Sequence, residues 1–227
     1  ELHVETGCTG LMGPSGSGKS ITLKCIAGVQ TADSGRIILD GRVLYDSEKK
    51  INLSPQKRKI GYLFQGYALF PNMTIEENIK TGLKAKKLPK DEIKQKANDM
   101  MKRFHIEELA KRYPRQISGG QKQRFTIARA LVRRPKVLIL DDSASALDFA
   151  TDAKLRKSLK QLGYEPTTFI VSQRTSSIKH ADMILVLDDG KVVGKGTHDE
   201  LLENCEVYHE IYMSQFKDKK ADEEVSA

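Results

Sequence analysis

The chain has 227 residues, of which 39% are hydrophobic and 30% are charged, with a formal net charge of +8. This length and composition are typical of one folded, soluble domain, and no apolar stretch approaches the roughly 20 residues that a membrane-spanning helix needs. The basic residues are spread along the chain, apart from the solvated-looking runs "SEKK" and "SPQKRK", which argues against a nucleic-acid-binding protein. Residues 1–12 lack a signal-peptide pattern and the three cysteines lack metal-ligand spacing. We therefore expect a cytoplasmic protein with reduced thiols.

Short apolar runs alternate with helical patterns, which indicates an α/β fold with a mainly parallel sheet and helices on its faces. A strand-like "TGL" precedes a glycine-rich loop, and a helical "SITLKCIAG" follows it. The turn signals "LDG" at 39–41 and "DDG" at 188–190 predict small antiparallel hairpins. Buried strands are predicted at four apolar runs, residues 60–64, 137–140, 167–171 and 183–187.

A long segment without a strand pattern separates the first two of these strands. A capping box of Thr74 and Glu77 predicts the beginning of one helix. After Pro89, four apolar residues fall on one helical face: Ile93, Ala97, Met100 and Phe104. We therefore expect a helical subdomain at about 72–133 inserted into a core of residues 1–71 and 134–216. The polar residues 217–227 are expected to form a disordered tail.

The strongest motif is "GPSGSGKS" at residues 13–20, which matches the phosphate loop G-x-x-x-x-G-K-[ST]. Its glycines let the backbone curl so that successive N–H groups point at one phosphate, and the following helix adds its dipole. Lys19 would place a positive charge on the β and γ phosphates, and the Ser20 hydroxyl would ligate Mg²⁺. A flexible Gly/Ser linker is the alternative interpretation. The predicted nucleotide-binding residues are Gly13, Ser15, Gly16, Ser17, Gly18, Lys19, Ser20 and Ile21.

Two adjacent aspartates occur in "LDDSASALD" at residues 140–148. Asp141 ends an apolar strand, and the carboxyl end of such a strand delivers a side chain to the crevice where a nucleotide binds. We therefore expect Asp141 to ligate Mg²⁺. Asp142 occupies the position at which many such enzymes carry the carboxylate that orients the attacking water.

A third motif, "ISGGQKQR" at residues 117–124, places Ser118 at the beginning of a helix. Taken alone, it is either a second phosphate-directed helix N-terminus or merely a helix cap. With the phosphate loop upstream, Gln65 in "YLFQGYALFP" and "SALD" at 145–148, the set of motifs resembles the nucleotide-binding domain of ABC transporters over nearly the whole chain.

The resemblance implies a P-loop NTPase fold of the ABC type, with an inserted helical subdomain and a small antiparallel β part. It also implies binding and hydrolysis of Mg-ATP, which would power transport through membrane domains on another chain. Two such domains would pair head to tail as a homo- or heterodimer, each nucleotide lying between them. The assembled chain would then lie at the inner face of the cell membrane.

The resemblance also implies individual roles. Ser15 to Ser20 would form the Walker A loop, and Gln65 would be the Q-loop glutamine that reaches Mg²⁺ and the water. Asp141 would be the Walker B aspartate, and Asp142 would fill the catalytic position. Gln173 stands where the family normally has the switch histidine. Two further groups are implied: the signature, Ser118, Gly119, Gly120 and Gln121, which faces the partner's nucleotide, and the D-loop, Ser145, Ala146, Leu147 and Asp148.

Three departures from the family pattern bear on activity: two predict slow hydrolysis, and the third concerns how adenine is bound. The family usually has glutamate in place of Asp142, and aspartate retracts the carboxylate by about 1.5 Å, where a misplacement of about 1 Å can cost roughly 10²-fold in rate. Gln173 can hydrogen-bond to a phosphate, but it cannot exchange a proton near neutral pH. Residues 1–12 also contain no aromatic residue to stack on adenine.

The two halves resemble different relatives, with the change near "RRPKV" at 133–137. The first half resembles importer ATPases of the molybdate type and the second resembles heterodimeric multidrug exporters, so the chain is either a hybrid or a naturally diverged subunit. The leading hypothesis is a slow ATPase domain of a transporter. The alternatives are an ATP-binding module that lends its signature to a partner's site, and an ABC-type ATPase that acts on DNA or ribosomes.

Overall fold

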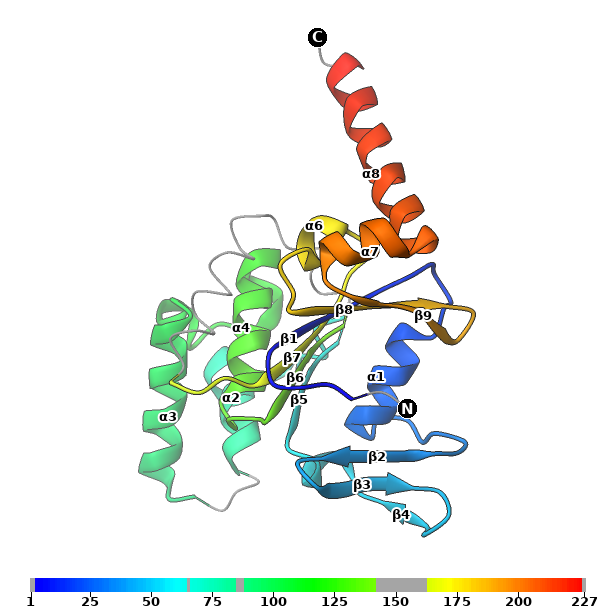
Figure 1. The fold of residues 1–227 in the computed structure, drawn as a ribbon. Helices are drawn as coiled ribbons and strands as arrows, with labels where there is room; N and C mark the ends of the chain where they lie inside the picture. Colours follow the sequence, from blue (N-terminus) through cyan, green and yellow to red (C-terminus); the bar gives the residue numbers. More distant parts are fainter. Residues whose placement is uncertain (1–2, 65, 85–87, 142–162, 226–227) are drawn as a thin grey trace. The chain divides into compact units, whose positions relative to one another are not determined.

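The computed structural model describes residues 3–64, 66–84, 88–141 and 163–225, with 216–225 as backbone only. The chain divides into two compact units (Figure 1). The first unit consists of Glu1–Arg58 and Thr167–Ala227, and the second of Lys59–Pro166. None of the helices within the described ranges is long and apolar enough to cross a membrane.

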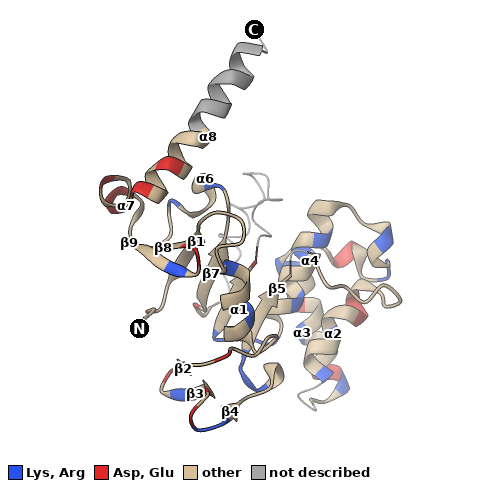
Figure 2. Cartoon of the chain, turned by 90° about the vertical axis from the view of Figure 1, so that its right-hand side faces the viewer, with Lys and Arg blue, Asp and Glu red and all other residues tan. Residues whose placement is uncertain are grey.

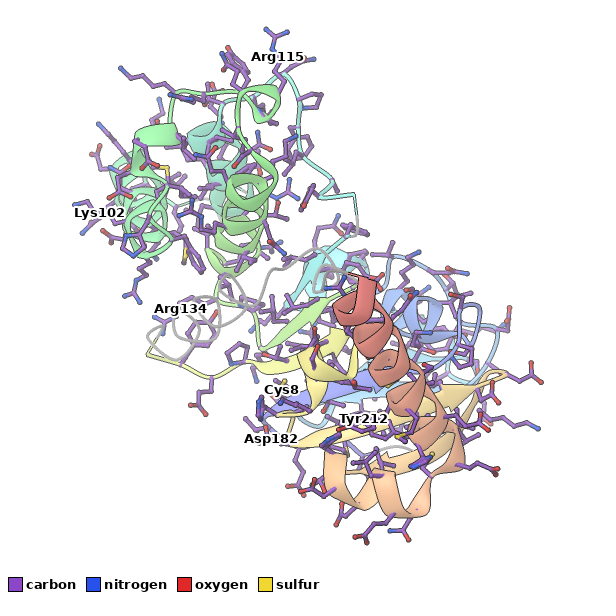
Figure 3. All side chains as sticks on the ribbon, turned by 90° about the horizontal axis from the view of Figure 1, so that it is seen from above. Cys8, Lys102, Arg115, Arg134, Asp182 and Tyr212 are labelled. Atoms are coloured by element: carbon purple, nitrogen blue, oxygen red, sulfur yellow. The ribbon has the colours of Figure 1, made fainter. Side chains whose placement is uncertain are left out.

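The sheet of the first unit is mainly parallel, as predicted. Its central strand pairs with a parallel neighbour on each side, so that Gly10 lies opposite both Ile170 and Ile184. Cys8 and Asp182 lie together at the beginning of two of these strands, where the Cys8 N–H donates to the Asp182 carboxylate at 2.7 Å (Figure 3). The strands are, in spatial order, β7 (Thr167–Val171), β1 (Cys8–Met12), β8 (Met183–Asp188) and the antiparallel β9 (Lys191–Gly196).

Both predicted hairpins are confirmed. Asp40 and Gly41 have φ values of 48° and 74°, and Asp189 and Gly190 have 43° and 73°. Two successive residues with positive φ are typical of the type I′ turns that join neighbouring antiparallel strands. The first turn belongs to a small antiparallel sheet of β2 (Arg36–Leu39), β3 (Arg42–Asp46) and β4 (Ile51–Asn52).

The helices of the first unit include one that differs from expectation. The last helix reaches Val225, although residues 217–227 were predicted to be disordered. The reason is local composition, because six of the eight residues of "KDKKADEE", three Lys, two Glu and one Ala, favour helix. The helical elements are α1 (Lys19–Ala27), the 3₁₀ turn η1 (Pro55–Lys57), α6 (Thr175–Ile178), α7 (His198–Asn204) and α8 (Glu206–Val225).

The second unit combines a parallel strand pair, β5 (Ile60–Leu63) and β6 (Val137–Leu140), with three main helices that pack against one another (Figure 1). The capping box is confirmed, since the Thr74 N–H donates to the Glu77 carboxylate at 2.8 Å. The predicted apolar face after Pro89 is buried as expected. The helical elements are α2 (Ile75–Lys84), α3 (Lys90–Arg103), η2 (Glu107–Leu109), η3 (Pro114–Gln116) and α4 (Gly119–Leu131).

Candidate functional site

The phosphate loop connects β1 to α1 through glycines with positive φ. Gly13, Gly16 and Gly18 have φ values of 147°, 85° and 92°. A Cβ atom at Gly13 would lie 1.9 Å from the carbonyl oxygen of Leu187, so a side chain cannot be accommodated there without moving the backbone. The first position of the motif therefore requires glycine for a packing reason.

Lys19 lies at the centre of this loop. Its Nζ donates to the carbonyl oxygens of Gly13 at 2.9 Å and Pro14 at 2.7 Å, and to the Ser17 hydroxyl at 3.1 Å. The side chain of Lys19 is only 7% exposed, so its ammonium group is held inside the loop. The structure thus brings Gly13, Ser17 and Lys19 together, as the motif predicts for a cradle that receives a phosphate.

The N-terminus of α1 is suited to an anion. The helix begins after Gly18, which has no capping side chain, and its first turn contains no acidic residue. Figure 2 shows basic and no acidic residues along α1. Because the N–H groups at a helix N-terminus attract negative charge, this end of α1 favours a phosphate group over a cation. Ser20 is partly exposed in the first turn, and Ile21 is exposed.

The other end of α1 is held by Arg58, which was predicted to lie in a solvated run. That interpretation was wrong, because the side chain of Arg58 is 1% exposed. Its guanidinium donates to the carbonyl oxygens of Cys25 at 2.7 Å and Ile26 at 2.9 Å, and to the Asn52 side chain at 2.8 Å. The last carbonyl groups of a helix lack partners within the helix and carry partial negative charge, which explains why a cation is buried here. Burial lowers the pKa of Arg58.

Asp141 follows β6 in the second unit and is 4% exposed. The Tyr62 hydroxyl on the neighbouring strand β5 donates to its Oδ2 at 2.5 Å. Burial, followed by the hydrogen bond to Asp141, raises the pKa of Tyr62 well above its usual value, so this hydroxyl keeps its proton. Tyr62 is not among the predicted site residues, and its only signal in the sequence is its place two residues before the end of the apolar run at 60–64.

The signature residues begin α4. The Ser118 hydroxyl accepts from the Gln121 N–H at 3.4 Å, and the Gln121 side chain accepts from the Ser118 N–H at 2.9 Å. This reciprocal capping box confirms the predicted helix start. Ser118, Gly119 and Gly120 are exposed, and a Cβ atom on either glycine would have open space. The contact of these residues with a partner's nucleotide stays a prediction.

The remaining predicted site residues are placed only in part. Gln173 is exposed two residues after the end of β7. Gln65, Asp142 and residues 145–148 lie outside the described residues. Within the described parts of the chain, no group of three His, Cys, Asp or Glu side chains that could hold a metal ion is present.

Comparison with known proteins identifies the family. Residues 2–145 match the family described as "ABC transporter". The chain is 39% identical over 204 residues to a probable sulfate/thiosulfate import ATP-binding protein CysA of Chlorella vulgaris, covering 88% of this chain and 84% of that protein. This chain belongs to the ABC transporter family.

Other comparisons agree with this ABC assignment. The chain is 42% identical over 197 residues to the spermidine/putrescine import ATP-binding protein PotA of Haemophilus influenzae, which covers 86% of this chain. It spans only about half, 51%, of that relative's length. A dimeric structure of the bacterial ABC transporter cassette MJ0796 matches with a TM-score of 0.76 at 30% identity, covering 86% of this chain and 88% of the cassette. The predicted ABC-type α/β fold is therefore confirmed.

Proposed function

We propose that this chain is the ATP-binding and slowly ATP-hydrolysing domain of an ABC transporter, which powers transport through a separate membrane partner. The observation that carries the proposal is the loop around Lys19 at the open N-terminus of α1, in a chain of this family. Gly13 and residues 15–21 bind the triphosphate, with the Lys19 ammonium exchanging its bonds to loop carbonyls for bonds to phosphate oxygens.

The residues fit Mg²⁺ as the companion of ATP. Ser20, Gln65 and Asp141 would hold the ion, since hydroxyl, amide and carboxylate oxygens are the ligands that it prefers. When bound, Mg²⁺ neutralises charge on the phosphate groups. The Tyr62 hydroxyl keeps one oxygen of Asp141 oriented, so that the carboxylate presents a defined face.

Asp142 and Gln173 limit turnover in this proposal. Asp142 orients the attacking water from a side chain that is one methylene shorter than glutamate. Gln173 donates its amide to the γ-phosphate without moving a proton. In a dimer of such domains, Ser118 to Gln121 and the D-loop at 145–148 contribute to the partner's nucleotide site. The division into a core and a helical subdomain at 72–133 belongs to the same proposal.

The direction and the substrate of transport are inferred from the relatives. The named relatives are importers of a polyamine and of an oxyanion, two substrates of opposite charge. Since the ATP-binding chains of both resemble this one, we infer that the membrane partner selects the substrate and that this chain serves import. The comparisons give no support to a molybdate-type relative.

A hybrid origin also finds no support in the comparisons. Alignments of 197 and 204 residues with single importer relatives are too long to fit on either side of residues 133–137. They must therefore cross the suggested junction.

The proposal is tested by binding and by turnover. ATP binding is measured by calorimetry for the chain and for Lys19→Ala, with Lys24→Ala on the same helix as the control. Loss of binding in Lys19→Ala alone is expected. Steady-state turnover is then compared with the double variant Asp142→Glu, Gln173→His at saturating Mg-ATP and several protein concentrations. The double variant is expected to gain about tenfold or more.

The outcomes separate the hypotheses. ATP binding without turnover in either form favours the ATP-binding module that lends its signature to a partner. Equal binding by Lys19→Ala and the unmodified chain contradicts the proposed site altogether.

A further inference from the structure

The helix α6 begins without a cap of its own. It runs from Thr175 to Ile178, and the preceding residue Arg174 provides no side-chain hydrogen bond to it. Thr175 is 4% exposed, so its N–H group is removed from water and needs an acceptor. A buried donor without an acceptor would destabilise the segment.

A residue from the C-terminal helix provides that acceptor. The Gln215 Oε1 on α8 accepts from the Thr175 N–H at 3.0 Å and from the Thr175 hydroxyl at 3.0 Å. Its Nε2 donates to the backbone carbonyl oxygen of Gln173 at 2.6 Å. The orientation of the amide follows from the partners, because the Thr175 N–H can only donate and the Gln173 carbonyl can only accept.

The part of α8 that carries Gln215 is itself anchored. Tyr208, Tyr212 and Gln215 are spaced at i, i+4 and i+7, which places them on one face of the helix. Tyr208 is fully buried, and its hydroxyl lies 2.8 Å from His198 Nδ1 in α7. The Tyr212 ring lies on the same helix, with its centroid 5.3 Å from that of His198 (Figure 3). Gln215 therefore extends from a supported helix rather than from a loose end.

We propose that Gln215 is a positioning residue that holds the backbone of the switch segment, Gln173–Thr175, and thereby sets the direction of the Gln173 side chain. The inference rests on the proposed function, in which Gln173 acts at the γ-phosphate. One side chain makes three hydrogen bonds to two residues of the segment, at sequence separations of 40 and 42. The C-terminal helix thus controls the switch position from outside the nucleotide-binding motifs.

The first test needs no nucleotide. Amide hydrogen exchange at Thr175 is measured for the unmodified chain, Gln215→Ala, Gln215→Glu and the control Ser214→Ala. The Ser214 hydroxyl donates to the Ile211 carbonyl oxygen within α8, so its removal leaves the switch segment untouched. Gln215→Ala is expected to raise the Thr175 exchange rate about fivefold or more, because two hydrogen bonds are lost. Gln215→Glu keeps the acceptor but loses the donor to Gln173, so Thr175 stays more protected than in Gln215→Ala.

The second test uses turnover in the Asp142→Glu, Gln173→His background. Gln215→Ala is expected to lower kcat there about tenfold with KM for ATP unchanged, since a misdirected switch residue affects chemistry more than binding. Equal Thr175 exchange in Gln215→Ala and the unmodified chain would overturn the inference, and so would faster exchange with unchanged kcat. Faster exchange in a chain that never hydrolyses ATP would keep the positioning of the segment and reject the proposed function instead.

Discussion

The Tyr62 hydroxyl and the Asp141 carboxylate are joined by a hydrogen bond of 2.5 Å across two neighbouring parallel strands. The register places Tyr62 opposite Ile139 and Leu63 opposite Leu140, so that Asp141 begins just where the pairing ends. A half-buried phenol that keeps its proton is a donor of fixed direction. This arrangement orients the aspartate that we propose as a Mg²⁺ ligand.

Replacing Tyr62 with Phe removes the donor while the ring remains. We expect the Mg²⁺ concentration for half-maximal ATP binding to rise about tenfold, as is typical when a partner of a metal ligand is lost. Calorimetric ATP titrations at several Mg²⁺ concentrations measure this effect. Tyr45→Phe is the matched control, because its buried hydroxyl donates to the Ala32 carbonyl oxygen at 2.6 Å in the first unit. An equal change in both variants would indicate a general loss of stability rather than a role for Tyr62.

Arg129 links the signature helix to the loop that follows Gln65. Its guanidinium donates to the carbonyl oxygens of Ala68 at 2.7 Å and Tyr67 at 2.9 Å, and both residues have positive φ. Lysine cannot span two carbonyl groups with a planar fork, so Arg129→Lys is expected to destabilise the chain by about 1–3 kcal/mol in urea unfolding. Arg124→Lys on the same helix loses one bond of 3.2 Å to the His105 carbonyl oxygen and should cost less than about 0.5 kcal/mol. Equal losses would argue against the link.

Alanine substitutions at Gly28 and Gly41, taken together, separate the cost of displacing Arg58 from the cost of backbone strain. Their φ values are 75° and 74°, so alanine costs about 1–2 kcal/mol at either position through the backbone alone. A Cβ atom at Gly28 would lie 2.5 Å from the Arg58 Nε, whereas at Gly41 it would meet nothing within 4 Å. We therefore expect Gly28→Ala to lose at least about 1 kcal/mol more than Gly41→Ala, because Arg58 must leave its carbonyl partners. Urea unfolding of both variants tests this, and equal losses would contradict it.

The hydrogen bonds that Glu77 accepts predict that the stability of the chain depends on pH. Its hydrogen bonds from the Thr74 N–H and hydroxyl lower the pKa of this carboxyl below its ordinary value of 4.5. A carboxyl group whose pKa is lower in the folded state than in the unfolded state stabilises the fold at pH values above its unfolded-state pKa. This stabilisation is lost as the pH falls through the folded-state pKa. Glu77→Gln should therefore lower the urea midpoint at pH 7, and the difference from the unmodified chain should shrink at about pH 3, below the usual Glu pKa. Glu108→Gln removes a charge outside any capping box, and a loss that persists unchanged at low pH would refute the prediction for Glu77.

The elements that could be predicted from the sequence are those whose cause is local. The glycine pattern of residues 13–20, the turns at Asp40 and Asp189 and the caps at Thr74 and Ser118 each depend on residues within one turn or loop. The four buried strands were predicted from their apolar runs for the same reason. Local rules failed for residues 217–225, where a highly charged composition suggested disorder although its residue types favour helix.

The contacts that shape the site arise between residues distant in the chain. Arg58 looks like a surface residue in "SPQKRK", and it is buried because its guanidinium donates to two carbonyl groups at the carboxyl end of α1, 32 and 33 residues away. Tyr62 is hydrogen-bonded to Asp141, which is 79 residues away in the sequence, and Gln215 is hydrogen-bonded to Thr175, which is 40 residues away. Local chemistry thus established that this chain has a phosphate loop, while the partners of Asp141 and Thr175 depend on strand register and helix packing. A buried polar group can hydrogen-bond only to the groups that folding places next to it, so its partners are decided by the tertiary structure.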